Sequence, residues 1–292
     1  VLLCLVVGLR LTNLGYAEFQ GDEATVLVRA AKLLEGDSQA IFNHKKGPAE
    51  ILIVAGMWRL TGITNEWMAR LPVSWANVLG LLAAFLIARF VISPRAGFFA
   101  LVLLGIEGYV LAFGRITQYQ SLVMALGMLG LLCLLWFYKI SYPVLVVCAA
   151  MLMSGAALAH YDAIFVLPPG LMLLVVTLWR ERRRATMWLA VALAVLLGIA
   201  ILTIFYWPFM QAAEPTTAPY LLNRVGAGLR NNLLPVFNLA AVYDSVYLIL
   251  LLTLGVSARI LWSWRPYGWL GTVLAGGLGA CWFICEPRWG GG

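Results

Sequence analysis

The stretch Phe19-Gln20-Gly21-Asp22-Glu23-Ala24 places two adjacent carboxylates just beyond the first apolar segment of a very hydrophobic chain. Apolar residues recur at helical spacing after it, and Gly36 suits a helix stop, so an amphipathic helix is predicted over 22–36. This helix is too polar to cross a bilayer and is expected to lie on the membrane surface. We expect the rest of the chain to be a scaffold that holds the two carboxylates opposite a cluster of basic residues.

The composition indicates an integral membrane protein. Of the 292 residues, 63% are hydrophobic and 11% are charged, whereas a soluble domain is about 45–50% apolar and about 25% charged. We therefore predict an all-α polytopic membrane protein with one transmembrane domain over 1–292. We expect it to be clipped at the N-terminus, because the first apolar segment is shorter than the roughly 20 residues that a span needs. A cleaved signal peptide is the alternative, against which stands the lack of a small-residue cleavage site. We expect it to be incomplete at the C-terminus, because the chain stops straight after an apolar segment.

Nine apolar segments are predicted to cross the membrane. A further apolar run over 48–62 is bounded by Glu50 and Arg59 and is too short to cross a bilayer about 30 Å thick, so we interpret it as a second juxtamembrane helix. Two outer loops follow from this assignment, 13–70 and 208–244. The predicted spans are 1–12, 71–92, 97–113, 119–138, 143–159, 163–179, 188–207, 245–262 and 267–285.

The loop Arg180-Glu181-Arg182-Arg183-Arg184 sets the predicted orientation. Short loops rich in arginine are cytoplasmic, and counting spans back from this loop puts Asp22 on the outer face, provided that 48–62 does not span. The basic residues then concentrate on the cytoplasmic face. The net charge of +7 is therefore an effect of membrane topology and not a sign of nucleic-acid binding.

Asp22 and Glu23 are the first candidates for chemistry. At the start of a helix, carboxylates satisfy free N–H groups and meet the positive end of the helix dipole, so capping is one interpretation. The other is a general base at the membrane surface, which takes a proton from an attacking hydroxyl or amine. One carboxylate would serve as the base, and its neighbour would orient it or bind a metal.

Basic residues in the same predicted loop could neutralise a phosphate. His44, Lys45 and Lys46 precede Pro48, and Arg70 stands just before the next span. They either bind lipid headgroups as a solvated loop or stabilise the negative charge that develops on a phosphate leaving group.

Two tight outer turns carry further polar residues. Arg115 either extends its charged end to the membrane interface or binds a lipid phosphate. In the second turn, His160 and Asp162 either form a polar turn with a helix cap or bind a headgroup, a sugar or a metal. Glu107 lies within a predicted span, where a charge is costly, so we expect it to face the bundle interior with a partner that the sequence does not identify.

Taken in order, these motifs resemble the polyprenyl-phosphate-sugar-dependent glycosyltransferases of the GT-C fold. The branch that they resemble includes the bacterial relatives of the protein O-mannosyltransferases and the aminoarabinose–lipid A transferases, of the glycosyltransferase family 39 type. The resemblance covers most of residues 10–180. It rests on Gly21-Asp22-Glu23-Ala24, His44-Lys45-Lys46-Gly47-Pro48, Ala69-Arg70-Leu71-Pro72, Gly114-Arg115-Ile116-Thr117-Gln118 and Ala159-His160-Tyr161-Asp162.

The resemblance implies a GT-C-like bundle and an inverting hexosyl or pentosyl transfer in the cell envelope. The donor would be a polyprenyl-phosphate sugar, the acceptor a protein, lipid or glycan, and the site would face outward from the bacterial inner membrane. Asp22 resembles the catalytic acidic residue with Glu23 assisting, and His160 and Asp162 would line the substrate cavity. The donor phosphate would meet His44, Lys45, Lys46, Arg70 and Arg115. Some relatives need a divalent cation and others do not, and the sequence leaves this open.

Two other classes of function are compatible with the sequence. A transporter or flippase of a lipid-linked glycan would use the same basic residues near a lipid phosphate. Alternating access, however, predicts ionisable residues near mid-membrane and repeated broken helices, and here Glu107 alone is deep and no repeat is visible. The third class is a structural membrane subunit without activity.

Overall fold

The structure is a computed structural model that describes residues 2–16, 21–44 and 46–228. All regular secondary structure within these residues is helical. The chain divides into two compact units, Val1–Ala213 and Glu214–Gly292. The candidate site and the packing described below lie in the first unit.

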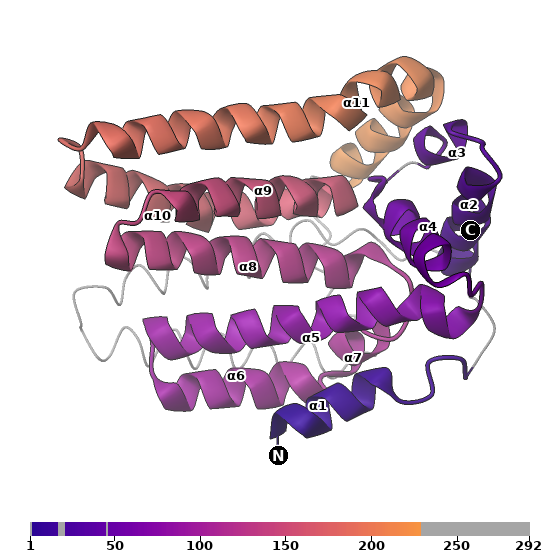
Figure 1. Ribbon diagram of the computed structural model, residues 1–292, viewed down its shortest axis with the longest axis horizontal. Helices are drawn as coiled ribbons and strands as arrows, with labels where there is room; N and C mark the ends of the chain where they lie inside the picture. Colours follow the sequence, from indigo (N-terminus) through magenta and orange to yellow (C-terminus); the bar gives the residue numbers. More distant parts are fainter. Residues whose placement is uncertain (1, 17–20, 45, 229–292) are drawn as a thin grey trace. The chain divides into compact units, whose positions relative to one another are not determined.

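A bundle of apolar helices forms the body of this unit (Figure 1). Four described helical segments are long and apolar enough to cross a membrane, namely Glu66–Val91, Tyr119–Ile140, Tyr161–Arg180 and Ala185–Phe209, and three shorter apolar helices accompany them. The predicted spans 245–262 and 267–285 lie outside the described residues. The helices of the bundle are α1 (Leu2–Leu11), α5 (Glu66–Val91), α6 (Pro94–Ile106), α7 (Gly108–Phe113), α8 (Tyr119–Ile140), α9 (Val144–Ala159), α10 (Leu167–Arg180) and the part of α11 (Ala185–Gly228) that lies in this unit, residues 185–213.

The outward faces of these helices are apolar. Contiguous apolar surface of this kind marks a membrane or protein contact, and its presence on four span-length helices confirms the predicted all-α membrane protein. Large exposed side chains on these faces include Trp75, Leu79, Phe99, Val175, Leu189, Leu196 and Ile199.

The two segments predicted to form juxtamembrane helices after the first span are both helical. α2 (Gly21–Leu34) and α4 (Ala49–Thr61) flank the short α3 (Gln39–Phe42), and all three lie at one end of the bundle (Figure 1). With thirteen residues α4 is too short to span a membrane. Its apolar face instead packs on that of α2. The buried residues of this contact include Val26, Leu27, Ala30, Ile51, Val54 and Trp58.

The connections between helices alternate between two ends of the bundle. The segments 12–65, 114–118 and 160–166 meet at one end, which we call the Asp22 end. The turns 92–93, 141–143 and 181–184 lie at the opposite end, which we call the Arg180 end.

Three differences from the expected helix boundaries are notable, and side-chain caps account for the first two. α5 begins at Glu66 and not at residue 71, because the Asn65 side chain accepts a hydrogen bond from the Met68 N–H at 2.9 Å and caps the helix. The expected span 97–113 is broken at Glu107, whose carboxylate accepts from the Val110 N–H at 2.7 Å and caps α7. α11 continues helically into the predicted loop 208–244, as far as Gly228.

At the Arg180 end, one carboxylate joins two turns. The Ser141 hydroxyl donates to Glu181 Oε1 at 2.9 Å, Arg184 Nε approaches Oε2 at 3.1 Å, and Arg180 Nε approaches Oε1 at 3.3 Å. The Ser141 hydrogen bond, followed by the Arg184 and Arg180 charges, holds the pKa of Glu181 below its ordinary value. A carboxyl group whose pKa is lowered by folding stabilises the protein above its unfolded pKa of about 4.3, and this contribution is lost as pH falls through the folded-state pKa.

We therefore expect Glu181→Gln to lower the melting temperature at pH 7, and we expect the difference from wild type to shrink as pH falls below about 4. Thermal unfolding in detergent micelles at pH 7, 5 and 3 measures this. Glu35→Gln, at an exposed carboxylate, is the matched control. A difference between wild type and Glu181→Gln that stays constant over this pH range would contradict the prediction.

Candidate functional site

Asp22 lies in the first turn of α2 with its side chain 67% exposed. Its Oδ2 is 2.9 Å from Lys46 Nζ, on the segment that leads into α4. The positive end of the α2 dipole adds to the favourable field around the carboxylate. The structure thus presents one accessible carboxylate next to one ammonium group at the Asp22 end.

Glu23, the adjacent carboxylate, has the opposite environment. Its side chain is fully buried, and Arg70 of α5 binds it with two hydrogen bonds, Nε to Oε1 and Nη2 to Oε2, both 2.9 Å long. The Thr117 N–H donates to Oε1 at 2.7 Å, and Arg70 Nη1 donates to the Leu14 carbonyl at 2.6 Å. This pair therefore joins α2, α5, the turn before α8 and the segment after α1.

Lys46 is positioned by a close contact of its neighbour with α9. A Cβ atom on Gly47 would lie 1.8 Å from the Leu158 carbonyl oxygen, so only glycine fits at this position. The Lys46 ammonium lies 4.9 Å from the centre of the Tyr119 ring, within the range of a cation–π contact. Lys45, predicted as a phosphate ligand, lies outside the described residues.

His160 contacts the same Tyr119 ring that Lys46 approaches. It is fully buried, and its ring stacks on Tyr119 with the ring centres 3.6 Å apart. Its Nδ1 accepts a hydrogen bond from the Asp162 N–H at 3.1 Å and lies 3.0 Å from Asp162 Oδ2. The Asp162 side chain is 40% exposed. The structure thus brings Asp22, Lys46, His160 and Asp162 into one continuous group, with Tyr119 between them.

His44, predicted as a phosphate ligand, is buried below the loop, with 4% of its surface exposed. The Arg29 guanidinium donates to Nδ1, so the imidazole proton is assigned to Nε2, which donates to Glu50 Oε2 at 2.9 Å. Burial lowers the pKa of the Arg29 guanidinium from its ordinary value. Both ring nitrogens contact protein groups, so His44 fastens α2 to α4 in this conformation.

Arg115 forms hydrogen bonds with the backbone at the end of α1. Its Nη1 donates to the Leu9 carbonyl at 2.5 Å and its Nη2 to the Asn13 carbonyl at 3.3 Å, and the guanidinium lies 5.1 Å from the centre of the Tyr16 ring. Arg70 approaches the same ring at 5.5 Å. The two arginines expected to meet a phosphate thus both hold the frame around Asp22.

A buried polar network that the sequence analysis does not identify lies within the bundle. Arg10 of α1 is fully buried and donates to Asn77 Oδ1 at 2.6 Å and to the Gly105 carbonyl at 2.9 Å. Asn77 in turn donates to Ser121 Oγ at 3.0 Å. An arginine and an asparagine inside otherwise apolar segments are the signal that could have revealed it, since such residues are costly in a membrane unless paired.

The described residues contain no group of three or more His, Cys, Asp or Glu side chains that could hold a metal ion. Asp22 moreover faces the Lys46 ammonium, a cation, at 2.9 Å.

The fold has a counterpart among solved structures. The crystal structure of ArnT from Cupriavidus metallidurans in the apo state matches this chain with a TM-score of 0.59 and 18% sequence identity, over 97% of this chain and 53% of that chain. This chain thus spans about half the length of its neighbour. No protein-family model and no curated protein matches the chain. At this level of identity the likeness concerns the fold, and it confirms the predicted GT-C-like helical membrane fold.

Proposed function

We propose that this protein is a membrane glycosyltransferase that moves a sugar from a polyprenyl-phosphate donor to an acceptor on the outer face of the bacterial inner membrane. The observation that carries the proposal is the exposed Asp22 carboxylate, 2.9 Å from the Lys46 ammonium at one end of a membrane bundle with an ArnT-like fold. A carboxylate beside a cation provides both a base for the acceptor and a counter-charge for a phosphate leaving group.

The proposed reaction is a single in-line displacement that inverts the anomeric centre. The acceptor hydroxyl or amine attacks the anomeric carbon while the bond from that carbon to the phosphate oxygen breaks. The lipid phosphate leaves with the bonding electrons, and the acceptor's proton passes to Asp22. Lys46 neutralises the charge that develops on the phosphate.

The resting ion pair suggests an order of events. In the structure without a donor, Lys46 is bound to Asp22 at 2.9 Å. The phosphate of a donor is a second anion that competes with this carboxylate for the ammonium group. Donor binding then moves the cation to the leaving group and releases the carboxylate for the acceptor's proton.

The neighbours of Asp22 and Lys46 have supporting roles in this proposal. Glu23 has both carboxylate oxygens bound to Arg70 or Thr117, so we assign Glu23 and Arg70 to positioning. Asp162, with its side chain 40% exposed, is the member of the His160 turn that reaches substrate.

We expect Asp22→Asn to reduce donor-dependent release of lipid phosphate by about 10² or more, the lower range for loss of a general acid–base group. The measurement uses purified protein in liposomes with labelled polyprenyl-phosphate sugars. Asp37→Asn is the matched control, because the amide oxygen can keep the hydrogen bond that Asp37 accepts from the Gln39 N–H at 3.0 Å.

Two outcomes of this experiment oppose the proposal. Turnover that is equal in wild type and Asp22→Asn would reduce this carboxylate to a helix-terminal charge. Absence of turnover with every donor, together with movement of the lipid across the bilayer, would support the transporter.

A further inference from the structure

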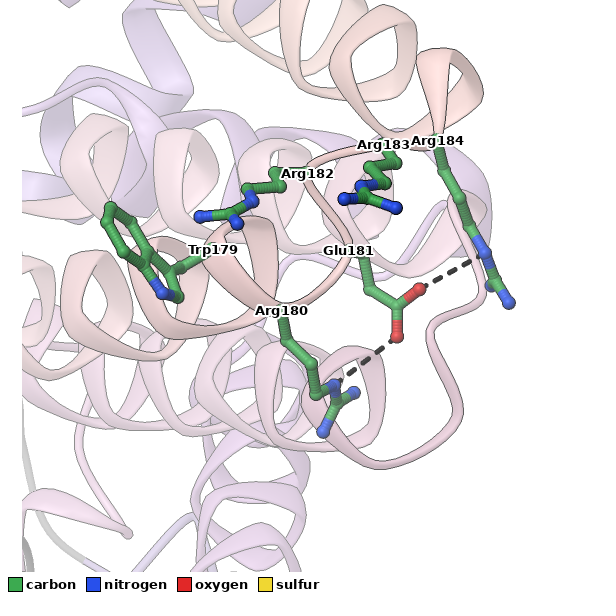
Figure 2. Close-up of a pocket in the computed structure, with 6 residues that line it drawn as sticks. All are labelled: Trp179, Arg180, Glu181, Arg182, Arg183 and Arg184. Carbon is green, nitrogen blue, oxygen red and sulfur yellow. Dashed lines mark hydrogen bonds and ion pairs between the residues drawn. The ribbon is translucent and has the colours of Figure 1, made fainter.

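An open basic depression lies at the Arg180 end, opposite the candidate active site. Figure 2 shows the six side chains that line it. It has a volume of about 430 Å³ and is formed by the end of α10 and the turn that leads into α11. We call it the arginine basin. Its lining residues are Trp179, Arg180, Glu181, Arg182, Arg183 and Arg184.

The charges of the arginine basin are unbalanced. It has four guanidinium groups and one carboxylate, and this carboxylate is shared by Arg180 at 3.3 Å and Arg184 at 3.1 Å (Figure 2). The Arg182 guanidinium lies 5.2 Å from the centre of the Trp179 ring. Among the residues that the structure describes, neither Arg182 nor Arg183 has an ion pair with a carboxylate, and both side chains are exposed. These two guanidinium groups are therefore available to an external anion.

The frame that carries these two arginines is held in place by hydrogen bonds. Arg180 donates to Ser141 Oγ at 2.9 Å and to the Tyr138 carbonyl, which anchors the basin to the turn after α8. On the other side, Trp188 Nε1 donates to the Arg182 carbonyl at 3.1 Å. Because these bonds fix the backbone of the turn, an anion bound there orders the side chains of Arg182 and Arg183 but not the backbone, which favours binding.

Exposed apolar surface continues from the basin along both flanking helices. Trp179 is 73% exposed on α10 and Trp188 is 50% exposed on α11, and Val175 and Leu189 are exposed next to them. Tryptophan is enriched where membrane helices meet the headgroup region. A ligand that fits both parts has an anionic phosphate at one end and hydrocarbon at the other.

We propose that the arginine basin binds the phosphate of an anionic phospholipid, with the acyl chains along the exposed faces of α10 and α11. Guanidinium groups bind phosphate oxygens through paired N–H donors, and Arg182 and Arg183 supply them here. The lipid anchors the Arg180 end at the headgroup level of its leaflet. This site is separate from the proposed sugar transfer and does not depend on it.

The test compares lipid binding by native mass spectrometry in detergent for three forms of the protein. Phosphatidylglycerol and phosphatidylcholine with identical acyl chains are the probes, and glycerol phosphate tests for a soluble anion. The variant is Arg182→Gln/Arg183→Gln. The matched control is Arg89→Gln/Arg95→Gln, which removes the same charge from two exposed arginines beside the 92–93 turn at the same end.

We expect wild type and the control to prefer phosphatidylglycerol, and we expect Arg182→Gln/Arg183→Gln to lose at least about 10-fold in affinity for it, the loss that follows from one missing hydrogen bond between charged groups. An equal loss in the control would mean diffuse surface attraction and would overturn the site. Competition by glycerol phosphate as effective as that of the lipid would also overturn it, because the acyl chains would then contribute nothing. If the variant fails to fold, absence of a preference for phosphatidylglycerol in wild type would itself overturn the proposal.

Discussion

Replacement of Arg70 by methionine is expected to lower the free energy of unfolding by about 3–5 kcal/mol, the usual cost of breaking a buried ion pair from one side. The side chains of Arg70 and Glu23 are 1% and 0% exposed. Without the guanidinium, Glu23 keeps the Thr117 N–H but loses both hydrogen bonds from Arg70 and the charge that balances it. Chemical or thermal unfolding in detergent micelles measures the loss.

Two further variants show whether the buried pair is the cause. The double variant Glu23→Gln/Arg70→Met removes both charges and is expected to be more stable than Arg70→Met alone, because no unpaired charge remains inside. Asp22→Asn removes the adjacent, exposed carboxylate and is expected to cost no more than about 1 kcal/mol. Equal destabilisation by Asp22→Asn and Arg70→Met would contradict the assignment of Asp22 to chemistry and of Glu23 to structure.

Replacement of Gly47 by alanine is expected to reduce sugar transfer by about 10², the loss that follows when a reacting group is misplaced by about 1 Å. The added Cβ would lie 1.8 Å from the oxygen and 2.4 Å from the carbon of the Leu158 carbonyl. This group belongs to the backbone of α9 and cannot rotate away, so the loop must move. Lys46 moves with it and leaves both Asp22 and the Tyr119 ring.

The liposome assay of lipid phosphate release measures this effect, and melting temperatures show the accompanying loss of packing. Gly56→Ala is the matched control, because Gly56 lies within α4 and its Cβ would meet nothing within 4 Å. In a helix interior, alanine is the more favourable residue by about 1 kcal/mol. Activity of Gly47→Ala equal to that of Gly56→Ala would show that the position of the Lys46 loop does not matter.

The surface helices and the spans could be predicted because their signals are local. The apolar stripe of α2 repeats every three to four residues, and the apolar part of α4 is short because it lies between Glu50 and Arg59. The helix breaks at Asn65 and Glu107 depend on side-chain caps that hydropathy alone does not detect. Hydropathy therefore locates the helices better than it locates their ends.

The different roles of Asp22 and Glu23 depend on rotation about the helix axis. Successive helical residues point about 100° apart, and Glu23 lies three, four and seven residues before Val26, Leu27 and Ala30, on the buried face of α2. This spacing is a signal in the sequence that distinguishes the two carboxylates. The partner of Glu23 cannot be predicted from sequence spacing, because Arg70 is 47 residues away and its contact with Glu23 depends on how α5 packs.

His44 shows the same dependence on packing at the other side of the loop. Its position beside two lysines favours a joint phosphate-binding role, yet the structure turns it inward between Arg29 and Glu50. Both partners belong to helices that meet only in the folded protein. A short basic run can therefore contain residues in opposite environments, and the sequence spacing alone does not distinguish them.

The hydrogen bonds of Glu23 also bear on how the protein is made. Its partners Arg70 and Thr117 follow it by 47 and 94 residues in the chain. A growing polypeptide exposes the Glu23 carboxylate at the membrane surface long before either partner has left the ribosome. The surface helices can take their final place only after α5 and the start of α8 have been inserted, so biogenesis of the site is completed by these later segments and not by the first loop itself.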